Sequence, residues 1–234
     1  MLKELRLLLG ACGPEAGMEE FRTAIMERNV LLKRTLATRK ESVRRLRELY
    51  GLSPHVLVFR ALRDVWRAGE QAQPLLALLC AVGRDPILRA TADLILSCPV
   101  GEAVTPHMIS ASVAEAFPGR YNSTTLANIG RHAASSWQQS GHLTGKLKKT
   151  RSQAQSTPAV VAYAALLGYI CGARGNALFQ TLWTQLLDSP EHMLRDQAFA
   201  ASQRGWMEYK HTGGVTEITF RFLLRKEDGR TCPE

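Results

Sequence analysis

The chain has 234 residues, of which 45% are hydrophobic and 22% are charged, so it can bury a sizeable core and is not a disordered tail. Its 30 Lys and Arg residues outnumber 21 Asp and Glu, and the formal net charge of +9 favours polyanionic partners. The five cysteines are odd in number and widely spread, without the spacing of a disulfide scaffold or a zinc module. This use of cysteine predicts a reducing compartment, the cytoplasm, and no metal site.

Glycine and proline punctuate residues 1–100, which predicts an N-terminal domain of short helices. A helical stretch is expected from Glu15 to Leu36, either continuous or interrupted near Asn29, and a capping box at 38–41 opens a helix that runs to Tyr50. Residues 74–82 are apolar on every side and predict the central helix of this part. The helix before Tyr50 is basic outside its core face, and we take four of its residues as a secondary DNA-binding set: Arg39, Lys40, Arg44 and Arg45. The competing interpretation is that these charges simply form a solvated face.

Residues 101–155 predict two helices around a tight turn, followed by a basic strand pair. The first helix spans about 105–116 and stops at Pro118-Gly119, and Asn122 or Ser123 caps the second. The second helix has one apolar stripe that includes Trp137, while its opposite face is polar and includes Gln138. This order of elements is typical of a winged helix-turn-helix, which places one helix in a DNA groove.

Ten residues of this segment are the candidate DNA-binding set. The polar face of the second helix offers donors and acceptors for base edges and phosphates through Ser123, Thr124, Asn128, Arg131, His132 and Ser135. After Gly141 the predicted wing adds positive charges that could straddle a phosphate backbone: Lys146, Lys148, Lys149 and Arg151. His142 is expected to contact phosphate or solvent. The competing interpretation is that any amphipathic helix has a polar face and any basic run is solvated.

Residues 156–234 are expected to form three helices and a β-hairpin. The segment 152–173 contains no charge, but its apolar run is shorter than the roughly 20 residues that span a bilayer, so we expect a buried helix rather than a membrane segment. Further helices are predicted at 176–188 and 190–203, and strands at 206–211 and 215–224. This hairpin is either a second wing, with Lys210 and His211 as secondary DNA-binding residues, or a hairpin that only packs on the core.

Enzyme motifs are lacking in the sequence. The segment GHLTGKL, at 141–147, has neither the glycine spacing nor the hydroxyl residue of a phosphate-binding loop. The six histidines are scattered, and no paired-carboxylate or nucleophile motif stands out. We therefore expect a protein that is not an enzyme and needs no cofactor.

Three segments together resemble BrxA, the accessory protein family of bacterial BREX phage-resistance systems. They are FRTAIMERNVLLKRTLATRKESVRRLRELYGL at 21–52, STTLANIGRHAASSWQQSGHL at 123–143 and AFAASQRGWMEYKHTGGVTEITF at 198–220. The similarity spans roughly residues 15–222 and consists of diffuse helical patterns rather than a catalytic signature. It implies a mostly helical DNA-binding protein encoded beside a DNA methyltransferase, an ATPase and a PGLZ-domain protein, which are its candidate protein partners. It supplies no functional residues of its own.

The sequence thus predicts a mainly α helical bundle with one or two winged helix-turn-helix modules and small β-hairpin wings. Two functions remain open: an accessory protein of a BREX-type phage-defence system that binds double-stranded DNA, or a helical adaptor whose basic surface assembles a defence complex with protein partners. The two differ in their response to salt and to DNA. RNA binding is a weaker third interpretation, because the chain has no aromatic strand of the kind that stacks bases.

Overall fold

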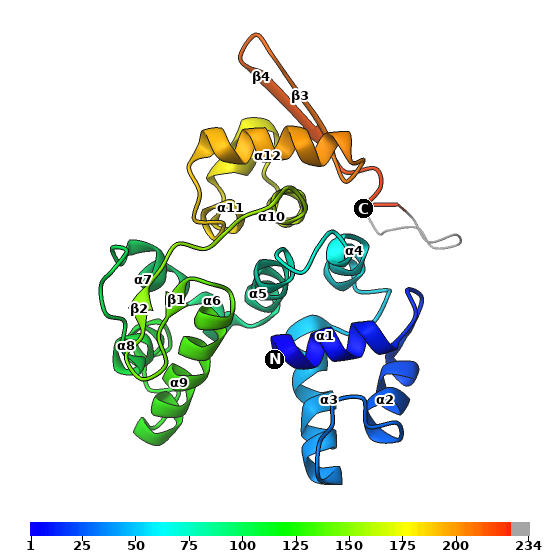
Figure 1. Cartoon of the computed structure of the whole chain (residues 1–234). Helices are drawn as coiled ribbons and strands as arrows, with labels where there is room; N and C mark the ends of the chain where they lie inside the picture. The colour runs from blue at the N-terminus through cyan, green and yellow to red at the C-terminus, as the bar shows by residue number, and fades with distance from the viewer. Residues whose placement is uncertain (226–234) are drawn as a thin grey trace.

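The computed structural model describes residues 1–225 and is mainly α-helical, with two small antiparallel β-hairpins (Figure 1). This confirms the predicted fold at the level of helices and hairpins. The first four helices are α1 (Leu2–Ala11), α2 (Met18–Met26), α3 (Leu36–Tyr50) and α4 (Leu57–Trp66). Of these, α1, α3 and α4 pack against a central helix, α5 (Gln73–Arg84), while α2 packs on α3 and α1.

Within the predicted helical stretch 15–36, α2 ends at Met26, close to the interruption expected near Asn29, because local hydrogen bonds favour a turn there. The Asn29 side chain accepts a hydrogen bond from the backbone N–H of Lys33 at 2.9 Å and donates one to the Lys33 carbonyl at 3.0 Å. Asn29 itself has φ of 48°, a left-handed conformation that asparagine tolerates. The cap of α3 also lies one turn earlier than predicted, at Thr35, whose hydroxyl accepts from the Thr38 N–H at 3.2 Å.

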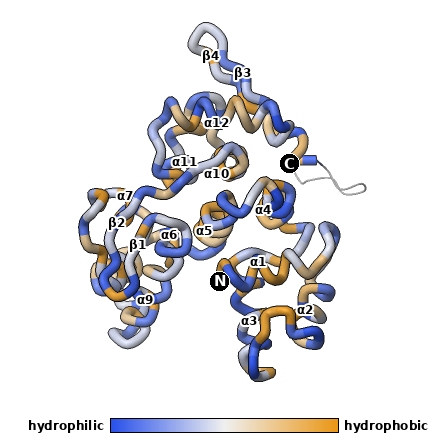
Figure 2. Tube along the Cα trace, viewed as in Figure 1, coloured by the Kyte–Doolittle hydropathy of each residue, from blue (hydrophilic) through white to orange (hydrophobic). Residues whose placement is uncertain are grey.

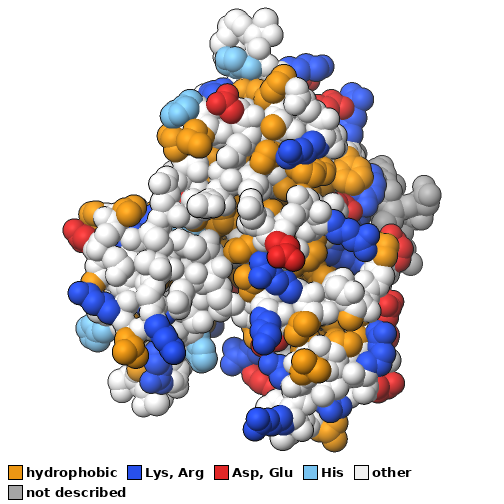
Figure 3. Space-filling model, in the orientation of Figure 1, with side chains coloured by type: hydrophobic (Ala, Val, Ile, Leu, Met, Phe, Trp, Pro, Cys, Tyr) orange, Lys and Arg blue, Asp and Glu red, His pale blue; other side chains and the backbone are white. Residues whose placement is uncertain are grey.

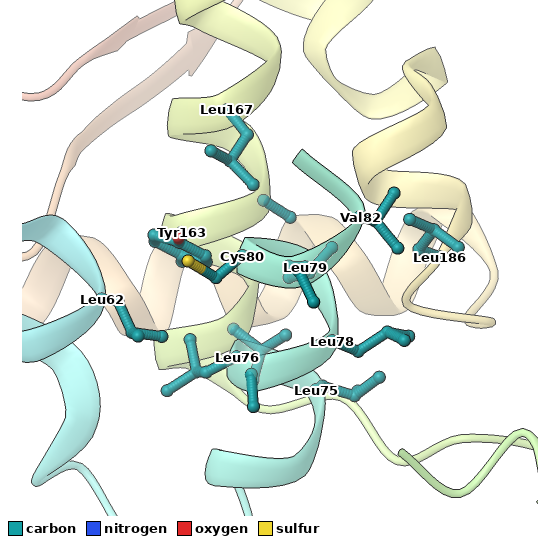
Figure 4. Close-up of a cluster of buried hydrophobic side chains, with 14 of the residues drawn as sticks. Leu62, Leu75, Leu76, Leu78, Leu79, Cys80, Val82, Tyr163, Leu167 and Leu186 are labelled. Atoms are coloured by element: carbon teal, nitrogen blue, oxygen red, sulfur yellow. The ribbon is translucent and has the colours of Figure 1, made fainter. Parts of the chain in front are cut away.

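The core is built around α5, as the apolar run at 74–82 predicts. The α5 residues that are at most 5% exposed include Leu75, Leu76, Leu78, Leu79, Cys80 and Val82. Figure 4 shows them between Leu62 of α4, Tyr163 and Leu167 of α10 (Pro158–Ile170), and Leu186. Burial raises the pKa of the Cys80 thiol to about 12, which makes it an unreactive core side chain.

After α5, two short helices lead into the second part of the chain. They are α6 (Pro86–Arg89), capped by the Asp85 carboxylate, and α7 (Ala92–Ser97). The helix pair α8 (Pro106–Ala116) and α9 (Ser123–Gln139) follows, and then a hairpin of β1 (Leu143–Thr144) and β2 (Thr150–Arg151).

The C-terminal part begins with α10, which is buried from Ala159 to Gly168. Figure 2 shows α5 and α10 as largely hydrophobic tubes at the centre of the molecule. The described residues contain no helix with the length and apolarity needed to cross a bilayer, in line with the expectation of a buried helix here. After α10 the chain forms η1 (Gly175–Gln180), α11 (Leu182–Gln185), α12 (Glu191–Gln203), β3 (Glu208–Thr212) and β4 (Val215–Thr219).

Two predictions in this part are wrong. The single helix expected at 176–188 is a 3₁₀ helix and one α turn, because Thr181 is extended, with ψ of 157°, and separates them. The last strand ends at Thr219 rather than 224, since the chain turns back and the Leu224 N–H donates to the Phe220 carbonyl at 2.8 Å. Phe222, which lies beyond the end of β4, is 42% exposed as a result.

The predicted boundaries near residues 100 and 155 fall between α7 and α8 and between β2 and α10. One hydrophobic cluster nevertheless continues through all three predicted regions, from Leu5 through Trp137 to Leu223. The three regions therefore share a core, and the α8–α9 segment packs against the rest through it.

Candidate nucleic-acid interface

The helix pair α8–α9 crosses at a close contact that requires glycine. A Cβ atom at Gly130 of α9 would lie 2.2 Å from the carbonyl oxygen of Pro106 in α8 and 3.2 Å from the Ser110 Cβ. The Thr105 hydroxyl caps α8 by accepting from the Met108 N–H at 3.2 Å. The Asn122 side chain caps α9 by accepting from the Thr125 N–H at 2.8 Å, which confirms the predicted cap.

The outward face of α9 carries hydrogen-bonding side chains and no carboxylate. Its exposed members include every residue that we predicted on this helix: Ser123, Thr124, Asn128, Arg131, His132 and Ser135. The Arg131 guanidinium donates a hydrogen bond to the Asn128 Oδ1, so these two side chains lie together on the helix surface. The helix sequence, STTLANIGRHAASSWQQ, contains no acidic residue that would repel a phosphate.

The hairpin after α9 is fixed to the end of that helix by Gln138. The Gln138 Nε2 donates to the Gly145 carbonyl at 2.8 Å, and its Oε1 accepts from the Lys149 ammonium. Lys146 and Lys148 are exposed in the loop between β1 and β2, whereas Lys149 is half-buried by this contact. The polar pattern placed Gln138 on the outward face, but only the structure shows that it positions the loop.

A third extended segment lines the same hairpin. The Gly101 N–H donates to the Arg151 carbonyl at 2.9 Å, and the Val104 N–H donates to the Lys149 carbonyl at 3.0 Å. Ala103 forms an antiparallel bridge with Thr150. The segment before α8 therefore pairs with β2 and ties both ends of the unit together.

The prediction that Arg151 contacts DNA is corrected by its burial. Its side chain is 2% exposed and forms two 2.9 Å hydrogen bonds to the Asp188 carboxylate. Its Nε also donates to the Ile95 carbonyl at 2.7 Å. Despite the energetic penalty of desolvating Asp188, the Arg151 hydrogen bonds keep the pKa of that carboxyl below its usual value. Arg151 holds β2 to α7 and to the chain after α11, and is out of reach of a phosphate.

His142 is also not at the surface, contrary to expectation. It is fully buried beside Trp137, with ring centroids 5.0 Å apart. Its Nε2 donates to the Leu186 carbonyl at 3.0 Å, because a carbonyl can only accept, and the Ser140 hydroxyl lies 2.8 Å from Nδ1. Burial is the largest influence and lowers the pKa of His142 to about 4, so the imidazole is neutral.

This neutral histidine predicts a pH-dependent stability. As the pH falls below the ordinary histidine pKa of 6.5, His142 becomes protonated in the unfolded chain. In the folded protein it becomes protonated only at about pH 4. We expect the free energy of unfolding to fall by about 2 kcal/mol between about pH 7.5 and pH 5. Urea unfolding of the parent and of His142→Gln measures it, and the variant should lack this part of the pH dependence. An equal pH dependence in both proteins would assign it to other groups.

The predicted secondary set on α3 separates into paired and unpaired charges. Arg39 donates to the Met26 carbonyl at 2.8 Å. Arg44 and Arg45 both bind the Glu41 carboxylate, at 2.6 and 2.8 Å, and this pairing lowers the pKa of Glu41 to about 2. Lys40 is exposed and has no side-chain hydrogen bond or ion pair within residues 1–225. The hydrogen-bonded arginines still carry charge at the surface, but three of the four are held locally.

A groove separates α9 from α3, and its volume is about 740 Å³. Apolar residues of α5 form its floor, Arg45 and Leu49 line the α3 side, and Asn128 and His132 line the α9 side. Figure 3 shows this hollow between the two helical parts, with Lys and Arg side chains on both. The outward face of α9 is thus open along one flank instead of being packed against α3.

The second hairpin differs from the first in charge. Lys210 and His211 are exposed, as predicted, but Lys210 lies opposite Glu217 in the strand register. Glu208 in the same hairpin pairs with Arg221 at 3.3 Å. The positive charge here is therefore largely balanced, unlike that of the loop at 145–149. DNA contact by Lys210 and His211 stays a prediction.

Among residues 1–225, no group of three or more His, Cys, Asp and Glu side chains is arranged to hold a metal ion. Cys12, Cys80, Cys98 and Cys171 are free thiols. No protein-family model, curated protein or solved structure matches the chain.

Proposed function

We propose that residues 101–152 form a winged helix-turn-helix that binds duplex DNA, with α9 as the recognition helix and residues 145–149 as the wing. The observation that carries this proposal is the outward face of α9: exposed, rich in donors and acceptors, and free of carboxylates, with the lysine loop fixed beside its C-terminal end. The order helix, turn, helix and hairpin supports it.

The lysine loop and the outward face of α9 make different kinds of contact with DNA in this proposal. Lys146 and Lys148 supply phosphate contacts, which give affinity and orientation without base selection. Asn128 and Arg131 have the side chains that pair with adenine and guanine in the major groove. Because Arg131 already lies against Asn128 in the free protein, little side-chain order has to be gained on binding.

Replacing Arg131 by alanine tests this assignment. Arg131 is exposed, so folding should be unchanged, while duplex binding should weaken by about 1–3 kcal/mol, roughly 5- to 150-fold. Fluorescence anisotropy with a labelled duplex measures the affinity, and Arg67→Ala, at an exposed arginine just after α4, is the matched control. A folded Arg131→Ala protein that binds as tightly as the parent would move the proposal to the adaptor function.

An adaptor function is also open to the protein, but through a surface other than the basic one expected from the sequence. The exposed side of α12 carries Glu191, Asp196 and Phe199, and Phe199 is 56% exposed. Carboxylates and an exposed aromatic ring suit a protein partner better than a phosphate backbone. DNA binding through α9 and protein contact through α12 are compatible, since the two helices lie in different parts of the molecule (Figure 1).

We place this activity in a BREX-type phage-defence system in the cytoplasm, on the support of the BrxA resemblance alone. The methyltransferase, the ATPase and the PGLZ-domain protein are the partners that this resemblance suggests. Co-purification of these proteins with the parent and with Phe199→Asp tests the placement. Loss of a partner with the variant supports contact through α12, and absence of all three from the parent contradicts the placement.

A further inference from the structure

A second basic surface lies on α2 and α3, on the side of α3 away from α9. A groove of about 660 Å³ runs between these helices. Five cationic side chains line it, Arg22, Lys40, Arg44, Arg47 and Arg84, against the two carboxylates of Glu19 and Glu48. We call these five residues the α2–α3 basic face. Figure 1 shows α2 beyond α3 as seen from α9.

Some cationic side chains of the α2–α3 basic face are paired with carboxylates or carbonyls, and others are not. Arg44 is bound to Glu41 and Glu48, and Arg84 donates to the Glu48 carbonyl at 3.0 Å. Lys40 and Arg47 are exposed and form no side-chain hydrogen bond or ion pair with any described residue. Arg22 has a single contact with Glu19, 3.8 Å long and exposed on both sides. Free cations therefore remain after the local pairs are formed.

The spacing of these charges suits a nucleic-acid strand. Lys40, Arg44 and Arg47 follow one another on one side of α3, and the seven steps from Lys40 to Arg47 span about 10 Å at 1.5 Å per residue. Phosphates rise by about 3.4 Å per nucleotide along each strand of a duplex. The row of side chains thus covers roughly three phosphate steps along the axis.

This face points away from the proposed recognition helix. Arg45, which lines the groove facing α9, follows Lys40 by five residues, a rotation of about 140° around the helix axis. A straight duplex bound against α9 lies on the Arg45 side and does not reach Lys40 or Arg47. We infer that the α2–α3 basic face binds a second segment of duplex DNA, so that one protein molecule bridges two duplexes.

The inference rests on the proposed function, and a bridging assay separates the two. One biotinylated duplex is fixed to beads, the protein is added, and retention of a second, fluorescent duplex is measured. Light scattering in the same buffer establishes whether the protein is monomeric. The test variant is Lys40→Glu/Arg47→Glu, with Lys40→Gln/Arg47→Gln as a milder form. The matched charge-reversal control is Arg67→Glu/Arg204→Glu, at two exposed arginines outside the proposed DNA-binding surfaces.

We expect the parent and the control to retain the second duplex. Both α3 variants should bind the first duplex normally, with the charge reversal losing about tenfold or more of the second. Bridging that persists in the charge-reversal variant, or a parent that holds only one duplex, overturns the inference and leaves the α9 proposal intact. Equal weakening of first and second duplex overturns it too, because one duplex would then contact both faces. A parent that binds no duplex contradicts the proposed function itself.

Discussion

Arg151→Ala should destabilise the protein by about 3–5 kcal/mol, the cost of breaking a buried ion pair from one side. The substitution removes both hydrogen bonds to Asp188 and the bond to the Ile95 carbonyl. The Asp188 side chain is only 17% exposed and would lose its counterion. Chemical unfolding with urea, followed by circular dichroism, measures the change in the free energy of unfolding.

The neighbouring exposed lysine supplies the control. Lys148→Ala removes the same unit of charge from the same hairpin but should change stability by no more than about 0.5 kcal/mol, as is usual at the surface. If Arg151→Ala is as mild as Lys148→Ala, the ion pair with Asp188 contributes little and the anchoring role of Arg151 is wrong.

Trp137→Ala should cost a similar amount, about 3–5 kcal/mol, through the cavity that it leaves. Trp137 is completely buried where α9 meets α7 and the hairpin, and its indole N–H donates to the Thr91 hydroxyl oxygen at 2.8 Å. Trp137→Phe keeps much of the apolar volume but loses this hydrogen bond, so it should cost less. Thermal and urea unfolding of both variants give the comparison, and a Trp137→Ala protein as stable as Trp137→Phe contradicts the packing argument.

The α8–α9 segment could be predicted from the sequence because its signals are local. The caps at Thr105 and Asn122, the stop at Pro118-Gly119 and the apolar stripe through Trp137 all act within a few residues. Periodicity then separates the buried from the exposed face of α9, and the exposed residues are those with polar side chains.

Arg151 and His142 could not be placed in this way. Their partners, Asp188 and Leu186, lie 37 and 44 residues further along the chain. A basic residue at the end of a lysine-rich run has the same local pattern whether it meets solvent or a distant carboxylate. The weak signal available is alternation, since β2 places Arg151 and Thr150 on opposite faces of a strand.

The N-terminal helices show a different limit. Apolar spacing continues past Met26, so the sequence indicated an interruption near Asn29 but not the two hydrogen bonds of Asn29 to Lys33 that stabilise the turn. Likewise, only part of the α2–α3 basic face could be predicted from the sequence. Lys40 and Arg44 stand in one basic run, whereas Arg22 and Arg84 join them only when α2 and α5 pack beside α3.

The salt dependence of duplex binding tests the central claim most directly. We expect log affinity of the parent to fall linearly with log salt, with a slope of about −0.9 for each phosphate contact. Lys146→Ala/Lys148→Ala should make that slope shallower by about two contacts, and should weaken all duplex sequences alike. Affinity that does not change between low and moderate salt, or an unchanged slope in the double variant, would contradict DNA binding by α9 and its wing.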